Sequence, residues 1–154
     1  RGERPGLRRD PGGPRPKLDA SPRRSTVTRS MDPELVAEVS RLHEAAWQDP
    51  SRWGVALGQA EKLLRRHLEA EPGCTEALTS LGALLSDLGR HGEAVVALRR
   101  ALSLRSSDAN TYFNLAVALM NAEERGAAPR HFAQAAARRA RPTTLRAYFD
   151  PHGH

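Results

Sequence analysis

Residues 75–108 read TEALTSLGALLSDLGRHGEAVVALRRALSLRSSD, and this stretch of 34 residues decides the fold. Its second half places a small residue, Ala94, four positions before a large apolar residue, Leu98. The same step recurs 34 residues earlier and 34 residues later, at Ala60 with Leu64 and at Ala128 with Phe132. A period of this length in a helix-rich chain indicates repeated pairs of helices, each of which buries its apolar face by stacking on the next pair.

Capping and breaking residues predict where the helices begin and end. Asp32-Pro33 opens a helix that runs to about Gln48, before Pro50 ends it. Pro72-Gly73 ends the second helix, Thr75 opens the third, and Gly89 to Gly92 form the turn into the fourth. Further helices are expected after Asp108, over about 126–139, and after Thr143 or Thr144, where a short seventh helix would carry Leu145, Tyr148 and Phe149.

The repeat resembles the tetratricopeptide (TPR) family, whose pattern is W-x2-L-G-x2-Y followed by A-x3-F and a late proline. Leu81-Gly82, Ala94 and Leu98 of the stretch above occupy these positions, although Ser106 replaces the late proline. The next repeat conforms except that Ala116 replaces the glycine and Ala140 replaces the proline. The repeat before it is irregular, because Trp47-Gln48 stand in the Leu-Gly positions.

The resemblance implies an all-α fold, a short TPR-type helical solenoid of about three helix pairs plus a C-terminal capping helix. We expect residues 1–30 to form a disordered tail rich in Arg, Pro and Gly, and residues 31–150 to form the TPR-like domain. Within it we expect an irregular repeat over about 32–74, repeats over 75–108 and 109–142, a capping helix over about 143–150, and a flexible end over 151–154.

The excess positive charge lies entirely in the predicted tail. Residues 1–30 hold nine Lys or Arg and three acidic residues, whereas the rest of the chain holds fifteen of each. The tail also has too few apolar residues to offset its ordering entropy. The tail is either incidental sequence, an arm that touches phosphates or acidic partners, a kinase site at Thr26, or a transit peptide. Because the rest of the chain has no net charge, nucleic acid is expected as a partner only through the tail.

Catalytic and metal-binding patterns are not expected from this sequence, and neither is a cofactor. His43-Glu44 begins a zinc-protease motif, but Trp47 stands where the second histidine ligand is required. Cys74 is the single cysteine, so an intrachain disulfide is excluded. No apolar stretch is long enough to span a membrane, and we expect an intracellular protein, cytoplasmic or nuclear.

The family resemblance places a peptide-binding groove on the first helix of each pair. Carried over residue by residue, the groove positions are Glu76, Thr79, Ala83, Ser86, Asp87, Asn110, Phe113, Asn114, Val117, Met120 and Asn121. A sub-group of the family binds acidic C-terminal peptides of chaperones, but only Asn114 of its ligand-binding residues is kept here. Thr79 and Ala83 stand where that sub-group has lysine and asparagine, so a chaperone peptide is not the expected partner.

Phe113, Val117 and Met120 form an apolar stripe at helical spacing on this face. The stripe is either exposed, as a partner site would be, or covered by the seventh helix through Tyr148 and Phe149. Glu76 and Asp87 add an acidic patch that could attract a basic peptide, including the chain's own Arg-rich tail.

These patterns predict a non-enzymatic adaptor or scaffold that binds a peptide or a partner helix in its concave groove. One alternative is the TPR portion of a larger enzyme, a transferase or hydroxylase, in which the repeats position a protein substrate. The other is binding of nucleic acid or an acidic partner through the basic tail.

Overall fold

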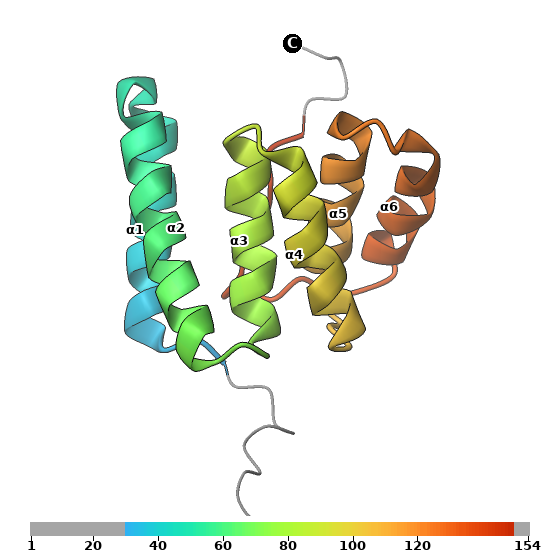
Figure 1. Cartoon of the computed structure of the whole chain (residues 1–154), viewed down its shortest axis with the longest axis horizontal. Helices are drawn as coiled ribbons and strands as arrows, with labels where there is room; N and C mark the ends of the chain where they lie inside the picture. The colour runs from blue at the N-terminus through green and yellow to red at the C-terminus, as the bar shows by residue number, and fades with distance from the viewer. Residues whose placement is uncertain (1–29, 150–154) are drawn as a thin grey trace, which may run out of the picture.

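The computed structural model describes residues 30–149, which form six α-helices arranged as three antiparallel pairs standing side by side (Figure 1). The pairs are α1 (Pro33–Gln48) with α2 (Trp53–Ala70), α3 (Thr75–Asp87) with α4 (His91–Ser103), and α5 (Ala109–Asn121) with α6 (Ala128–Ala136). Short 3-10 turns, η3 (Pro50–Arg52) and η4 (Arg125–Ala127), precede α2 and α6. The predicted all-α array of helix pairs is confirmed.

Local capping accounts for several of these boundaries. The Asp32 carboxylate accepts a hydrogen bond from the Glu34 backbone N–H at the start of α1, and Asp108 does the same for Asn110 at the start of α5. Asp49 caps η3 between the first two helices, since its carboxylate accepts a hydrogen bond from the Ser51 backbone N–H. Gly89 adopts φ of 83° in the turn between α3 and α4, a conformation that favours glycine.

The small residues of the repeat lie where the helices approach one another. Ala60, Ala94 and Ala128 are each fully buried, one in the second helix of every pair. Gly82 of α3 faces α4 so closely that an added Cβ would lie 2.6 and 2.8 Å from the two methyl carbons of Leu98. The glycine is therefore a packing requirement, because even a methyl group would overlap the neighbouring helix.

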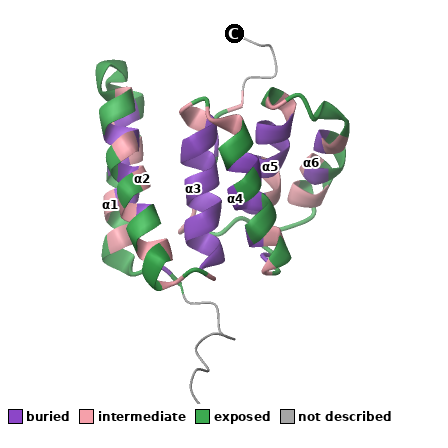
Figure 2. Cartoon of the chain, viewed as in Figure 1, coloured by how far each residue is buried: buried purple, intermediate pink, exposed green. Residues whose placement is uncertain are grey.

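Helix α3 is the centre of the molecule, and Figure 2 shows it buried along almost its whole length. Every residue from Thr75 to Ser86 is buried. Its neighbours α2, α4 and α5 account for part of this burial. The remaining face of α3 is covered by the chain that follows α6, which runs back towards the start of α3 and then along α3 in the direction of the helices (Figure 1).

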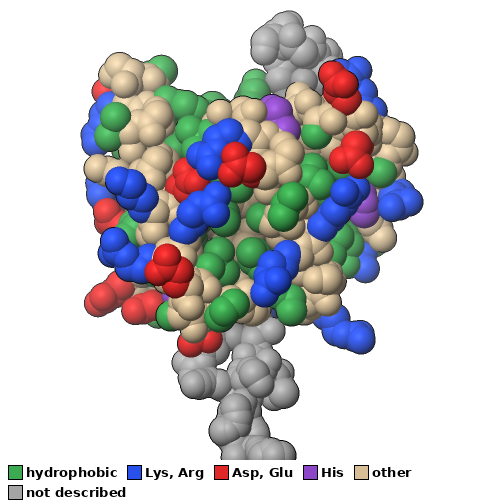
Figure 3. All heavy atoms as spheres, in the orientation of Figure 1, with side chains coloured by type: hydrophobic (Ala, Val, Ile, Leu, Met, Phe, Trp, Pro, Cys, Tyr) green, Lys and Arg blue, Asp and Glu red, His purple; other side chains and the backbone are tan. Residues whose placement is uncertain are grey.

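The side of the molecule seen in Figure 3 shows Lys and Arg side chains interspersed with Asp and Glu. One cluster joins α2 to the start of α4: Arg90 donates to both oxygens of Glu61 at 2.8 and 3.0 Å, and Arg65 and Glu93 extend it. Burial alone would raise the pKa of Glu61, but hydrogen bonds from Arg90 and Arg65 outweigh it and lower that pKa. This side of the domain therefore presents paired charges rather than a field of one sign.

The predicted seventh helix is wrong. Residues 145–149 have no helical turn and are extended. All of the predicted tail except Ser30, and the whole of the predicted flexible end over 151–154, lie outside the described residues.

Candidate functional site

Residues 141–149, called the C-terminal segment below, lie against side chains of α3 and α5. Residues 142–144 form a turn, and residues 145–149 are the extended part. The surface that receives them is called the α3/α5 face. It consists of the side chains that contact the segment directly, namely Glu76, Ser80, Asp87, Asn110, Phe113 and Asn114.

The main chain of the segment is bound by side chains of the α3/α5 face. Ser80 Oγ accepts from Leu145 N at 3.0 Å. Asn114 donates through Nδ2 to Leu145 O at 3.0 Å and accepts through Oδ1 from Ala147 N at 2.8 Å. Asp87 Oδ1 accepts from Tyr148 N at 3.0 Å. Because these bonds involve only backbone groups of the segment, they recognise an extended chain without requiring particular side chains.

Burial alternates along the segment as it does along a strand that covers a core. Leu145 and Ala147 are buried, with 9% and 4% of their surface exposed, while Arg146 and Tyr148 are exposed. Phe149 is half-buried, and its ring centroid lies 5.3 Å from that of Phe132 and 6.4 Å from that of Phe113. Every second side chain therefore points into the domain.

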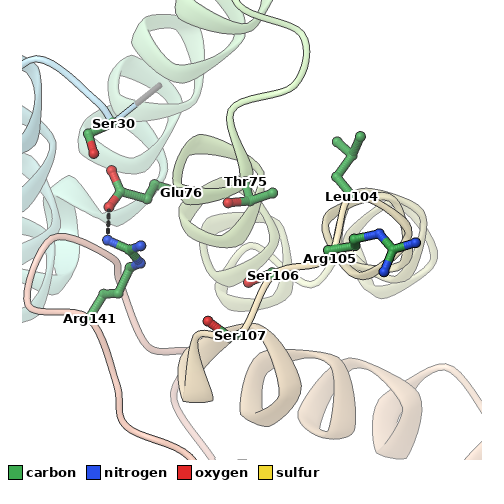
Figure 4. A pocket seen from close by; sticks show the side chains of 8 residues that line it. All are labelled: Ser30, Thr75, Glu76, Leu104, Arg105, Ser106, Ser107 and Arg141. Carbon is green, nitrogen blue, oxygen red and sulfur yellow. Dashed lines mark hydrogen bonds and ion pairs between the residues drawn. The ribbon is translucent and has the colours of Figure 1, made fainter. Parts of the chain in front are cut away.

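Glu76 anchors the beginning of the segment, as Figure 4 shows. Its carboxylate, 4% exposed, accepts from Arg141 Nη1 and from Thr143 Oγ1, both at 2.9 Å. Its other oxygen accepts from Met31 N at 3.0 Å, which ties the entry to α1 to the same group. The basic side chain that pairs with Glu76 is therefore Arg141 of the C-terminal segment. The predicted attraction of this acidic patch for the Arg-rich tail concerns residues that lie outside the described range.

Asp108 holds the turn by which the segment leaves α6. One carboxylate oxygen accepts from Arg141 N at 3.0 Å, and the other accepts from Thr144 Oγ1 at 2.7 Å. Asn110 adds a bond from Nδ2 to Thr144 Oγ1 at 3.0 Å. The N-cap of α5 thus also fixes the direction in which the segment starts across the α3/α5 face.

An aromatic cluster lies at the other end of the segment. The Trp47 ring packs edge-on against Trp53 at 4.7 Å and lies 5.2 Å from the ring of Tyr148. His43 Nε2 lies 3.2 Å from Asp87 Oδ2, and Trp53 Nε1 donates to Asp87 O. The segment is therefore in contact with all three helix pairs.

The structure divides the predicted groove residues into three groups. Glu76, Asp87, Asn110, Phe113 and Asn114 contact the C-terminal segment. Thr79, Ala83, Ser86 and Val117 are buried, and Thr79 Oγ1 lies 2.6 Å from Thr111 Oγ1. Met120 is partly buried against the core, and Asn121 is exposed with its amide donating to Val117 O. Which of them bind a partner stays a prediction.

The apolar stripe is not exposed. Val117 has 1% of its surface exposed, and Phe113 and Met120 pack against the core cluster that also contains Leu145 and Ala147. Phe149 packs near Phe113 in this covering, but Tyr148 instead packs against Trp47.

Sequence reasoning missed Ser80 and the main-chain role of the segment. The alternation of apolar side chains at 145, 147 and 149 was the available signal.

Three other features of residues 30–149 concern metal binding, the single thiol and the membrane. They contain no group of three or more His, Cys, Asp or Glu side chains placed to hold a metal ion. Burial raises the pKa of the Cys74 thiol, which keeps it in its less reactive protonated form. Within the same range, no helix combines the length and apolar character needed to cross a membrane.

Comparison with known proteins identifies the repeat. Residues 76–122, which include most of α3 and all of α4 and α5, match the family model of the TPR repeat. No curated protein is similar enough to count as a relative.

Two solved structures resemble the fold weakly. MamA MSR-1 has a TM-score of 0.48 at 22% identity, with 68% of this chain and 67% of that chain covered. MamA AMB-1 has a TM-score of 0.49 at 23% identity, with 64% of this chain and 61% of that chain covered. The chain therefore spans about two thirds of their length or less, and these likenesses are too weak to assign a function.

Proposed function

We propose that this chain is a non-enzymatic adaptor, because its residues 76–122 match the model of the TPR repeat and repeats of that family are protein-interaction modules. The α3/α5 face binds an extended segment of a partner protein. The observation that carries this proposal is the pair of bonds between Asn114 and the main chain of Leu145 and Ala147.

The polar atoms of the face favour an extended ligand over a helical one. Asn114 meets a carbonyl oxygen at one residue and an N–H two residues later. An extended chain offers both groups on one edge. In the interior of a helix each carbonyl oxygen already accepts from the N–H four residues later, so neither group is free to bind Asn114. The function proposed here is therefore narrower than the sequence alone predicts, because it selects an extended peptide over a partner helix.

Burial strengthens the hydrogen bonds between this face and the main chain of a ligand. Asn114 is fully buried and Ser80 is fully buried, so hydrogen bonds to them form away from competing water. A ligand that left these groups without partners would incur a desolvation penalty of about 1–3 kcal/mol for each.

A library of linear peptides displayed on phage tests the proposal. The target is the full-length chain carrying Leu145→Ala, which weakens the hold of the C-terminal segment on the face. Enriched peptides are then measured against the same chain with Ser80→Ala or Asn114→Ala added, and against a matched control with Asn121→Ala added. Asn121 lies in the same helix as Asn114, but its amide bonds to Val117 O instead of to the segment.

We expect enriched peptides to lose binding with Ser80→Ala and with Asn114→Ala and to keep it with Asn121→Ala. Circular dichroism checks that every target is folded, and Ser80→Ala, which removes a single oxygen atom, serves if Asn114→Ala unfolds the chain. Peptides that bind all four targets equally, or no enrichment at all, would contradict the proposal.

A further inference from the structure

Resting on this proposed function, we infer that the partner segment carries the side-chain pattern of residues 141–149 and that those residues occupy the face until such a partner displaces them. The pattern is a basic residue, a leucine-sized residue four positions later, a small residue two after that, and an aromatic residue two further on. In this chain these are Arg141, Leu145, Ala147 and Phe149.

The basic position follows from Glu76. This carboxylate is 4% exposed and is an acceptor for three donors, two of which, Arg141 Nη1 and Thr143 Oγ1, belong to the C-terminal segment. A ligand that brought an acid or an apolar group to this place would leave a nearly buried charge without its countercharge. The face therefore selects a positive charge at the start of the ligand.

The two inward positions select by size. Leu145 and Ala147 are both part of the core cluster, and Ala147 has only 4% of its surface exposed. A charged side chain at position 145 would be buried without a partner, and a large one at position 147 would overpack the core. A leucine-sized residue followed two positions later by a small residue satisfies both constraints.

The last position selects an aromatic ring. Phe149 completes a cluster with Phe113 and Phe132, whose ring centroids are 5.5 Å apart. The distances lie in the range in which aromatic pairs gain energy beyond the area that they bury. The positions between them, Arg146 and Tyr148, are exposed and their side chains contact the domain through the rings of Phe113 and Trp47, so they are left out of the pattern.

The C-terminal segment is held in a way that permits displacement. It belongs to no helix, its bonds to the face come from a few side chains, and the side chain of Arg141, which pairs with Glu76, is 53% exposed. Segments with few internal bonds open locally without unfolding the elements beneath them, so the face can become free while the helix pairs stay folded.

A labelled peptide with the sequence of residues 141–149 tests the inference on the full-length chain. Its binding, followed by fluorescence anisotropy, is compared between the wild type, Leu145→Ala, Phe149→Ala, and a control, Arg146→Lys. The control changes an exposed position of the segment and keeps the positive charge that lies over the Phe113 ring.

We expect at least about tenfold tighter binding to Leu145→Ala and to Phe149→Ala than to the wild type, because weakening the attached competitor raises the fraction of free face. Arg146→Lys should bind as the wild type does. A peptide with aspartate in place of its leucine, or with alanine in place of its first arginine, should bind Leu145→Ala at least about tenfold more weakly.

Equal affinity of the labelled peptide for the wild type and both segment variants would overturn the competition, and undiminished binding of the aspartate peptide would overturn the pattern. A concentration-dependent dimer of the wild type in sedimentation velocity would show that a second copy supplies the segment, which also overturns occupation within one chain. If displayed peptides depend on Asn114 but share a different pattern, this inference fails while the proposed function stands. If no displayed peptide depends on Asn114 or Ser80, both fail.

Discussion

Replacing Asn114 with alanine tests how strongly the domain depends on its contacts with the C-terminal segment. The Asn114 side chain is fully buried and makes three hydrogen bonds: to Thr79 O at 3.3 Å, to Leu145 O at 3.0 Å, and from Ala147 N at 2.8 Å. Asn114→Ala removes all three while leaving the helix-forming tendency of α5 intact or improved.

The expected cost comes from the groups that lose their partner. Thr79 O lies inside helix α3, where it also accepts the N–H four residues on, so its loss is small. Leu145 O and Ala147 N belong to no helix, so they have no helical hydrogen bond to keep when Asn114 is removed. An unsatisfied buried backbone group costs about 1–3 kcal/mol, so the bound state of the segment should lose about 2–4 kcal/mol once entry of water is allowed for.

Hydrogen exchange and urea denaturation together measure this loss. The amide of Ala147 should exchange faster by about two orders of magnitude, which corresponds to roughly 3 kcal/mol. Amides within α3 and α4 should keep most of their protection, because the helix pairs also contact one another directly. The free energy of unfolding of Asn114→Ala should fall by no more than the stabilisation that the bound C-terminal segment gives to the domain.

Asn121→Ala is the matched control, an amide-to-alanine change in the same helix at an exposed position. It should change stability by less than about 0.5 kcal/mol and leave exchange at Ala147 unaltered. The reasoning is refuted if Asn114→Ala and Asn121→Ala give the same exchange rate at Ala147, since the amide bonds would then not hold the segment.

Three further predictions concern the helical framework. Gly82→Ala should lower the free energy of unfolding in urea by up to about 2 kcal/mol, because overlap with α4 outweighs the gain in helix propensity. The control Gly92→Ala, whose added Cβ meets nothing within 4 Å, should be neutral or stabilising, and a stabilising Gly82→Ala would contradict the close approach of α3 and α4. Arg90→Ala should cost less than about 1 kcal/mol near pH 7. Because the pKa of Glu61 is lowered in the folded state, this stabilisation should be present above the unfolded pKa of about 4.3 and should be lost as the pH falls through the lower pKa of the folded state. A difference from the wild type that persisted in thermal melts at pH values where Glu61 is protonated would count against the ion pair. Cys74 should react with iodoacetamide far more slowly in the folded chain than in denaturing urea, since burial raises the pKa of its thiol; equal rates would show that the site is open.

The helices could be predicted from the sequence because their signals are local. Asp32 and Asp108 act as N-caps through bonds that span two residues, and proline and glycine stop the helices by their own backbone limits. The 34-residue period then gives the pairing, because repeated small residues can only be explained by repeated close contacts. Gly82 is the clearest example, since its absent side chain matches Leu98 on the next helix.

The C-terminal segment could not be predicted in the same way. Leu145, Tyr148 and Phe149 have helical spacing, whereas Leu145, Ala147 and Phe149 have strand spacing, so the sequence supports both periods. A helix this short forms only with outside support, because nucleation is unfavourable. The support present here comes from Ser80, Asp87 and Asn114, which bind an extended main chain, and their role depends on a tertiary arrangement that no local pattern encodes.

The chemistry of the α3/α5 face explains why a capping helix is excluded there. A helix would cover the apolar surface of Phe113 and Val117 well enough, but its interior backbone groups are bonded to one another. Asn114 would then keep only its bond to Thr79 O, and the acceptor and donor that now bind the segment would be unpaired, at a cost of about 1–3 kcal/mol for each group. An extended chain satisfies the amide through the carbonyl at 145 and the N–H at 147, and buries apolar side chains on the same edge. The combination of a buried amide with an apolar surface thus selects extended chain as the only backbone that satisfies both, whether that chain is the protein's own or a partner's.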